Sequence, residues 1–427
     1  MATLLMVESW LHSTGLRLPP LIHALGHRYV LLTRDPALYP GAADGSAHPV
    51  VRDADDIVIV DTNDHGAVVA AAKSLAARRG IDGVVTTCDY YLEAVAHAAD
   101  ALRLPGPAPD VVKRMLRKHE VRTATARAGL ATPAHAAADT WPVARAAAER
   151  IGYPVVAKPV DLNSGTSVCR ADDEAALKDA YGEITAAEHN TRGQRLARLV
   201  LVEELLDGPE VSVEAMTYDG VTTVLGITGK DVAGAPAFVE AGHVFPAMIA
   251  PDQAREVQAH VRAALTAVGH RHGLSHTEVR LTEAGPRIVE INPRQGGGYI
   301  FDLVRLVTGV DPLELLVALA LGDPASAQRH PAQAPASAVA FVMSPEPGTV
   351  TAVEGVEQLA GDDTVVRCEI TTPQRVAHPC DNNSRLGHIL VTGPDAASAH
   401  ARARAAIGLF RLGMDDGRIV APLGAEA

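Results

Sequence analysis

The chain has 427 residues, too many for one ordinary hydrophobic core, so two or three domains are expected. Apolar residues make up 47% of it and charged residues 21%, which is the composition of a folded soluble protein. The net charge of −13 argues against nucleic acid as a partner.

Cysteine usage and the N-terminus exclude two further classes. The four cysteines lie far apart and form no CxxC pair, so neither a disulfide framework nor a zinc site is predicted. The opening segment MATLLMVESW lacks a basic region and Glu8 interrupts its apolar run, which is not the pattern of a signal peptide. No apolar stretch approaches the roughly 20 residues that span a bilayer. We therefore expect a cytoplasmic protein with no membrane partner.

The first hundred residues alternate short apolar runs with helical stretches. Strands are predicted over 3–7, 29–32, 57–60 and 83–87, and helices near 18–25, 65–79 and 91–102. This βαβ alternation indicates a parallel sheet with helices on its faces. The turn Ser13-Thr14-Gly15 after the first strand either holds a ligand or is an ordinary turn. No GxGxxG fingerprint is present, so a dinucleotide site is not supported.

Two more regions follow the turn-rich segment LPGPAP at 104–109, which we interpret as a boundary. The middle region is predicted to contain helices over 110–128, 142–150 and 251–272, strands over 154–160, 199–204 and 210–218, and a hairpin over 276–282 and 287–292. A linker rich in Pro, Ala and Gln near 323–337 leads to the last region. There we predict strands near 338–343, 365–370 and 387–392 and a helix near 395–409.

The most informative segment is HTEVRLTEAGPRIVEINPRQGGG, residues 276–298. With a three-residue loop at 283–285, the predicted cross-strand pairs are Thr282–Pro286, Arg280–Ile288 and Glu278–Glu290. The opposed carboxylates Glu278 and Glu290, with Asn292 on the same face, repel each other unless a cation lies between them. Oxygen ligands of this kind suit Mg²⁺. The alternative is a solvated hairpin face that tolerates like charges.

Lysine is scarce, with six residues in the chain, so the position of each is informative. Lys158 ends the apolar strand YPVVAKP, where its ammonium group suits a phosphate oxygen. Lys118 lies in a basic run that, taken alone, favours a solvated helix face. The polar loop 160–168, with Gly165, offers backbone N–H groups to phosphates. Glu203 and Glu210 follow, and a carboxylate at this place could accept hydrogen bonds from a ribose.

In order and spacing, these segments resemble the ATP-grasp superfamily over roughly residues 1–325, with a looser match to the C-terminus. Within it, EAGHVFPA (240–247) and NPRQGGG are similar to the stand-alone L-amino acid ligases, which form dipeptides. The resemblance implies an α/β (α+β) fold with a Rossmann-like pre-ATP-grasp domain at 1–109. It further implies an ATP-grasp domain at 110–325, which includes a phosphate-covering lid at about 134–204. A small α/β C-terminal domain at 335–427 would complete the chain.

The resemblance also implies a role for individual residues. Residues expected to bind ATP are Lys118 and Lys158 at the α- and β-phosphates, Ser164, Gly165 and Thr166 over the γ-phosphate, Glu203, Glu204 and Leu206 at adenine, and Glu210 at the ribose. Residues expected to bind two Mg²⁺ ions, or Mn²⁺, are Glu278, Glu290 and Asn292. Residues expected at the carboxylate substrate are Glu240, His243, Arg294, Gly297 and Gly298, with Arg294 and Gly297 catalytic. Gly298 also predicts a roomy substrate site.

The implied activity is an ATP-dependent carboxylate–amine ligase that works through an acyl phosphate and releases ADP and phosphate. Its partners would be small carboxylates and amines, and it would be a monomer or homodimer. Two alternatives stay open. A purine-pathway ligase or a carboxylase shares the core, although a carboxylase would carry glutamate where this chain has Gly298. A non-catalytic ATP-binding protein would be expected to lose the metal ligands that this chain keeps.

Overall fold

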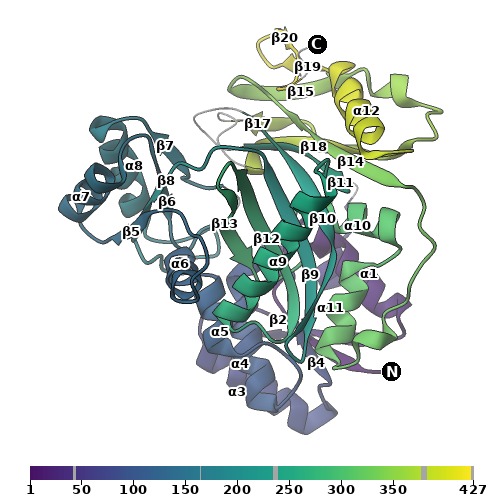
Figure 1. Ribbon diagram of the computed structural model, residues 1–427. Coiled ribbons are helices and arrows are strands. Elements are labelled where there is room, and N and C mark those ends of the chain that lie inside the picture. Colours follow the sequence, from purple (N-terminus) through teal and green to yellow (C-terminus); the bar gives the residue numbers. More distant parts are fainter. Residues whose placement is uncertain (42–44, 164, 234–238, 377–381, 425–427) are drawn as a thin grey trace.

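The computed structural model describes residues 1–41, 45–163, 165–233, 239–376 and 382–424 (Figure 1). Its described strands form four sheets, three of four strands and one of eight. The predicted loop residue Ser164 lies outside the described residues. No described helix is both long and apolar enough to cross a membrane.

The N-terminal sheet is parallel and has the strand order β3-β2-β1-β4. Its elements are β1 (Thr3–Val7), α1 (Thr14–Ala24), β2 (Arg28–Thr33), η1 (Pro36–Leu38), α2 (Pro49–Arg52), β3 (Asp56–Ile59), α3 (His65–Arg79), β4 (Gly83–Val85), η2 (Asp89–Tyr91) and α4 (Leu92–Leu102). Every strand and helix predicted for this region is present, and the parallel pairing confirms the βαβ interpretation.

Both faces of the N-terminal sheet are covered, which explains its continuous apolar strands. Leu5 of β1 packs in one core with α3 and α4, while Leu4 packs in a second core with α1 and α11 (Pro312–Ala320). The turn after β1 is also closely packed against the neighbouring backbone. A Cβ at Gly15 would lie 1.7 Å from the carbonyl oxygen of Trp10, so only glycine permits this close approach.

The helix predicted over 110–128 is two helices, α5 (Pro109–Met115) and α6 (Lys118–Arg127). The break has a local cause. The backbone N–H of Lys118 donates to the carbonyl of Val160 at 3.1 Å, and Arg117 Nη1 donates to Asp161 at 2.6 Å. These contacts to a neighbouring loop replace the intrahelical bonds at this point. Lys118 is therefore the first residue of a helix rather than part of a solvated helix face.

A small antiparallel sheet, here called the lid sheet, has the order β5-β8-β6-β7. Its elements are β5 (His135–Ala138), α7 (Trp141–Ile151), β6 (Val155–Pro159), β7 (Cys169–Ala171), α8 (Glu174–Ala186) and β8 (Val200–Glu204). α7, β6 and β8 confirm the predicted elements. β5, β7 and α8 were not predicted, because two of them are strands of three or four residues and the third is an alanine-rich helix with a weak apolar face.

The central sheet has eight strands in the order β13-β12-β9-β10-β11-β14-β18-β16, all antiparallel. The strands are β9 (Glu210–Tyr218), β10 (Val221–Ala233), β11 (Val239–Phe245), β12 (Gly273–Thr282), β13 (Gly285–Asn292), β14 (Ala336–Met343), β16 (Val365–Ile370) and β18 (Arg385–Gly393). Helices α9 (Pro251–Val268), α10 (Ile300–Thr308) and α12 (Ala396–Gly408) pack on it. In Figure 1 the lid sheet lies to its left, and its strands β14 and β18 lie beside the C-terminal elements at the top.

The last region completes the central sheet rather than standing apart, since β11 pairs directly with β14. It also forms a small sheet in the order β17-β15-β19-β20. The remaining elements are η3 (Pro324–Ser326), β15 (Gly348–Glu354), η4 (Val356–Leu359), β17 (Gln374–Val376), η5 (Asn382–Ser384), β19 (Arg411–Met414) and β20 (Ile419–Val420). The predicted division at 109 and near 325–335 remains a proposal.

The hairpin of β12 and β13 keeps the predicted pair Glu278–Glu290, but the rest of the register differs. Its turn contains two residues, so Thr282 pairs with Gly285 and Arg280 with Arg287. A β-bulge at Val289 absorbs the difference and restores the pairing at Glu278. The predicted pairs Arg280–Ile288 and Thr282–Pro286 are therefore wrong, because the sequence did not reveal the bulge.

Candidate active site

A cavity of about 210 Å³ lies between the lid sheet and the central sheet and brings together most of the predicted site residues. Those that line it are Lys118, Lys158, Gly165, Glu203, Glu204, Leu206, Glu210, Glu240, His243, Glu278, Glu290, Arg294, Gly297 and Gly298. Asn292 lines an adjoining cavity, together with Lys118 and Glu290. Thr166 lines neither of these two cavities.

Lys118 reaches this cavity because it begins α6. Its Nζ donates to the carbonyl oxygen of Leu162 at 2.6 Å and lies 3.1 Å from Glu290 Oε2. The helix N-terminus adds the positive end of its dipole to the ammonium charge. An anion at this position would contact both the ammonium group and the positive end of the helix dipole.

Lys158 is buried near the end of β6 and forms an ion pair with Glu203 of the neighbouring strand β8 at 2.5 Å. The buried guanidinium of Arg122 holds the other side of the same carboxylate at 2.6 Å. Burial raises the pKa of Glu203, but the two cations outweigh it and lower that pKa to about 2. The Glu203 side chain therefore orients the two cations, and residues 204–206, which follow it, also line the cavity.

The two opposed carboxylates of the hairpin are compensated by lysine. Glu278 lies 2.7 Å from Lys230 Nζ, and Glu290 lies 3.1 Å from Lys118 Nζ. Burial raises the pKa of Glu290, but Lys118 outweighs this effect and holds the pKa well below its ordinary value. The repulsion that suggested a metal ion is thus already offset by side chains, so charge balance alone does not require Mg²⁺.

Lys230 is the centre of a buried ion-pair cluster. Its Nζ lies 2.8 Å from Glu210, 2.7 Å from Glu240 and 2.7 Å from Glu278. Burial lowers the pKa of Lys230, but the three carboxylates together raise it well above the ordinary value. Its partner Glu240 also accepts a 2.9 Å hydrogen bond from Arg385 Nη2 of β18. The C-terminal region therefore contributes directly to this cavity.

His276 lies behind Glu278 on β12. Its Nδ1 is 2.9 Å from Glu214 and its Nε2 is 3.2 Å from Glu278. Burial lowers the pKa of His276, but Glu214 and Glu278 together raise it to about 9. The ring therefore donates to both carboxylates and fixes the Glu278 carboxylate in position.

Arg294, just past β13, meets the N-terminal region. Its Nη2 donates to Asp89 Oδ2 at 3.0 Å, and its Nε also contacts this carboxylate. Asn163 from the lid donates to the same oxygen at 2.8 Å. Asp89 follows β4 at the carboxyl edge of the parallel sheet, the edge where open α/β sheets bind ligands.

His243 and Gly298 contradict the expectation of a roomy substrate site. His243 lies on β11, not in a loop, and is 1% exposed. A Cβ at Gly298 would lie 2.7 Å from His243 Nε2, so the imidazole fills the space beside the glycine. Neither ring nitrogen of His243 has a hydrogen-bond partner among the described residues. Burial lowers the pKa of His243 to about 3, so the ring is neutral and can contact a ligand.

Several side chains of the site had no individual role predicted from the sequence: Asp89, Arg122, Asn163, Lys230 and Arg385. Two of them carried a usable signal. Lys230 is one of the six lysines and ends the alternating run VLGITGK. Asp89 lies four residues after the end of a buried parallel strand. Arg122, Asn163 and Arg385 lie in segments whose local pattern is common in surfaces and loops.

The donor set of the hairpin fits Mg²⁺. Glu278 and Glu290 supply carboxylate oxygens, and Asn292 lies on the paired strand opposite His276. Asn292 Nδ2 donates to Glu290 at 2.7 Å, which leaves its Oδ1 as an oxygen donor. Mg²⁺ is bound by oxygen ligands of this kind, and substrate phosphates can complete its coordination.

Three family models match the chain. An ATP-grasp N-terminal domain matches residues 23–106, an ATP-grasp domain matches 151–302, and an L-amino acid ligase C-terminal domain 2 matches 340–415. The chain is 32% identical over 195 residues to carnosine synthase 1 of Gallus gallus. The aligned segment covers 44% of this chain and 20% of that protein. It is 23% identical over 266 residues to alanine–anticapsin ligase of Bacillus subtilis (strain 168), covering 58% of this chain and 56% of that protein.

The chain therefore spans about a fifth of one of these relatives and little more than half of the other. Among solved structures, the L-amino acid ligase from Bacillus licheniformis superposes with a TM-score of 0.78 at 22% identity. The match covers 96% of this chain and 98% of that one. This similarity, with the matched domains, confirms the predicted mixed α/β fold.

Proposed function

We propose that this chain, which carries an ATP-grasp domain and an L-amino acid ligase C-terminal domain, is an ATP-dependent carboxylate–amine ligase. The observation that carries the proposal is one cavity lined by three lysines, two opposed hairpin carboxylates and Arg294. The names of the relatives support the same class, since one is a carnosine synthase and the other an alanine–anticapsin ligase. We propose an amino acid as the carboxylate substrate.

ATP would bind with its phosphates between the lid sheet and the hairpin. Lys118 and Lys158, now paired with carboxylates, would turn to phosphate oxygens, and the hinge at 204–206 would meet adenine. Glu210, now paired with Lys230 and Arg280, would accept from the ribose hydroxyls. Glu278, Glu290 and Asn292 would hold two Mg²⁺ ions. The metal, when bound, neutralises the negative charge of the β- and γ-phosphates.

The reaction would proceed in two steps. A carboxylate oxygen of the first substrate attacks the γ-phosphorus. The bond between the γ-phosphorus and the β,γ-bridging oxygen breaks, and ADP leaves. The uncharged amine of the second substrate then attacks the carbonyl carbon, phosphate leaves, and the amine loses a proton to give an amide. Arg294 would steady the acyl phosphate, and Glu240 and His243 would contact the substrates. Closure of the lid would keep water from the acyl phosphate.

Nucleotide products and trapping test this proposal. In ATP, Mg²⁺ and amino acid mixtures we expect ADP and phosphate, and withholding the amine while adding hydroxylamine should give a hydroxamate. AMP and pyrophosphate as the main products would contradict the mechanism. Turnover that needs bicarbonate would favour a carboxylase, and turnover that needs a phosphoribosylamine would favour a purine-pathway ligase. Nucleotide binding without turnover would favour a binding protein.

A further inference from the structure

A second cavity, of about 430 Å³, adjoins the candidate active site. The two share Lys118, Leu162, Asn163 and Glu290. Its other walls come from the N-terminal region, the junction of α5 and α6, and lid residues 190–196. His65 and Glu93 line it on the N-terminal side.

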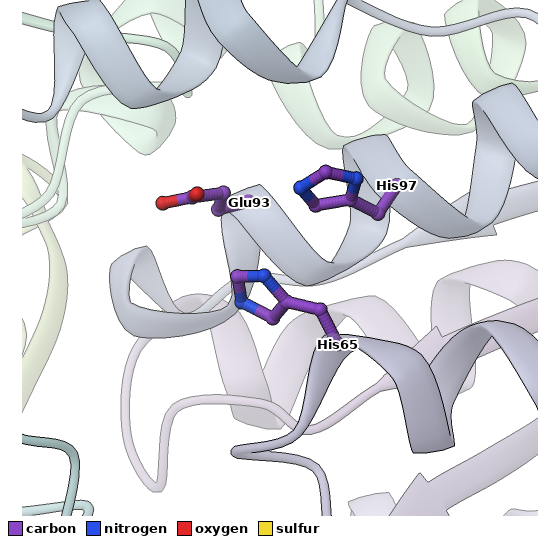
Figure 2. A group of neighbouring side chains, drawn as sticks. All are labelled: His65, Glu93 and His97. Carbon is purple, nitrogen blue, oxygen red and sulfur yellow. The ribbon is translucent and has the colours of Figure 1, made fainter.

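These two residues belong to a cluster with His97. His65 is the first residue of α3, and Glu93 and His97 lie one turn apart on α4 (Figure 2). One ligand atom from each, an imidazole nitrogen or a carboxylate oxygen, lies within 4.8 Å of the other two. The two imidazole ring centroids are 5.0 Å apart. Figure 2 shows the three side chains close together, His65 from one helix and Glu93 and His97 from the other.

The backbone holds the cluster in place. The side chain of Asp64 caps α3 and accepts from the backbone N–H of Gly66 and Ala67, which fixes the first turn and the position of His65. α3 and α4 pack through a shared apolar core that includes Val68 and Ala94. Glu93 and His97, four residues apart, lie on one face of α4. The three side chains are therefore presented by rigid elements.

The donor atoms of these three side chains have no other polar partner in the described part of the chain. No hydrogen bond or ion pair of the described residues involves the side chain of His65, Glu93 or His97, although all three are half-buried. Burial lowers the pKa of His65, which favours the neutral imidazole that binds metals. The three groups therefore lie close together without a hydrogen bond or ion pair among them.

Two imidazoles and one carboxylate are a donor set for a first-row transition metal. Imidazole suits Zn²⁺ and related ions better than Mg²⁺, which prefers oxygen. With bonds of about 2.0–2.2 Å, ligand atoms around zinc lie roughly 3.4 Å apart, so small side-chain rotations would bring these three onto one ion. Sites with two histidines and a glutamate keep a fourth position for water or another donor.

We propose that His65, Glu93 and His97 form a binding site for a zinc-type divalent ion at the wall of the second cavity. The site is separate from the hairpin carboxylates and does not depend on the proposed ligase function. The ion links α3 to α4 within the N-terminal region. Its fourth ligand is water.

Zinc titration of the metal-stripped full chain tests the proposal. Excess Mg²⁺ should be present, so that zinc does not occupy the hairpin site. Calorimetry should show one equivalent of Zn²⁺ with a dissociation constant in the micromolar range or lower. His65→Ala and His97→Ala should each weaken binding at least tenfold, while His189→Ala, which removes an exposed histidine of the lid region, should not. Equal binding by His65→Ala and wild type, or no stoichiometric binding by wild type, would overturn the proposal.

A second measurement does not rely on variants. Diethyl pyrocarbonate modifies accessible, unliganded imidazoles, and mass spectrometry reports each histidine separately. Saturating Zn²⁺ should protect His65 and His97 in the wild-type chain and leave His189 reactive. Protection of none of the three, or of all three alike, would contradict a defined site even if a variant failed to fold.

Discussion

The hairpin carboxylates make the sharpest test at the scale of single residues. Glu278→Gln and Glu290→Gln each remove one charge from the proposed metal site while keeping side-chain size. We expect each change to lower phosphate release by roughly a hundredfold or more, because charge on the transferring group would lose a direct counter-ion. Glu283→Gln, at the exposed turn of the same hairpin, should leave the rate unchanged.

Near wild-type turnover of both variants at millimolar Mg²⁺ would contradict the metal assignment. Circular dichroism should accompany the rates. Lys230 loses one of its three partners in Glu278→Gln, and this loss could affect folding rather than metal binding.

Lys158 tests the nucleotide assignment. Lys158→Ala removes a buried ammonium group whose pKa is already lowered by burial. We expect ATP affinity, measured by calorimetry, to fall roughly tenfold or more, because a point charge near a phosphate would be lost. Lys73→Ala on the exposed face of α3 is the matched control. Equal nucleotide affinity in the two variants would contradict a phosphate role for Lys158.

His270 predicts how stability depends on pH. It is 3% exposed, and its Nδ1 has no partner among the described residues. Burial lowers its pKa from 6.5 to about 4. Between these values the unfolded chain binds a proton that the folded chain does not, so the stability present above pH 6.5 is lost as the pH falls.

Urea unfolding can measure this loss. Between pH 7 and pH 5, the free energy of unfolding of wild type should fall by about 2 kcal/mol more than that of His270→Leu. His189→Leu, at an exposed position, should keep the wild-type dependence. An identical pH dependence in wild type and His270→Leu would mean that His270 titrates normally in the folded chain.

At the scale of elements, the lid sheet is held to the N-terminal region by the segment 187–199. Arg192 Nη2 donates to the carbonyl of Ser9 at 2.9 Å, and its guanidinium lies 5.8 Å from the centre of the Trp10 ring. Asn63 Nδ2 donates to the carbonyl of Arg192, also at 2.9 Å. These contacts join two regions that meet at the second cavity.

Arg192→Ala should therefore loosen the lid without unfolding it. Hydrogen exchange in 187–199 should become faster, and more ATP should be hydrolysed per amide formed, because water would reach the acyl phosphate. The exposed Arg195 of the same segment provides the control, and Arg195→Ala should behave as wild type. Unchanged exchange and unchanged coupling in Arg192→Ala would show that this contact does not hold the lid.

At the scale of the whole molecule, the C-terminal region is part of the central sheet. β14, β18 and β16 extend it beyond β11, and Arg385 of β18 contacts Glu240 in the cavity. Removing residues 336–427 would expose a strand edge and the apolar face of α10, which packs on β14. We expect a chain ending at 335 to aggregate or to lose its cooperative thermal transition. A folded fragment that binds ATP as the full chain does would contradict this.

The sequence by itself predicted the elements that have a clear apolar periodicity and supplied a hypothesis for the chemistry of the site. The N-terminal βαβ pattern, β6, β8, β9 and the hairpin follow from apolar periodicity, which is a local property. The pair Glu278–Glu290 was also predictable, because a hairpin brings residues close in sequence together. Lys118 and Lys158 were found through the scarcity of lysine and a resemblance in spacing.

Only the tertiary structure determined which side chains, far apart in the sequence, contact each other. Arg122 with Glu203, Arg294 with Asp89 and Lys230 with Glu240 join separate elements, and no local pattern encodes such a pairing. The break before Lys118 coincides with contacts to the loop at 160–161, and the bulge at Val289 accommodates the two-residue turn of the hairpin. The filled space beside Gly298 depends on where β11 places His243. Burial then turns these contacts into shifted pKa values, because solvent exposure is a property of the folded chain as a whole.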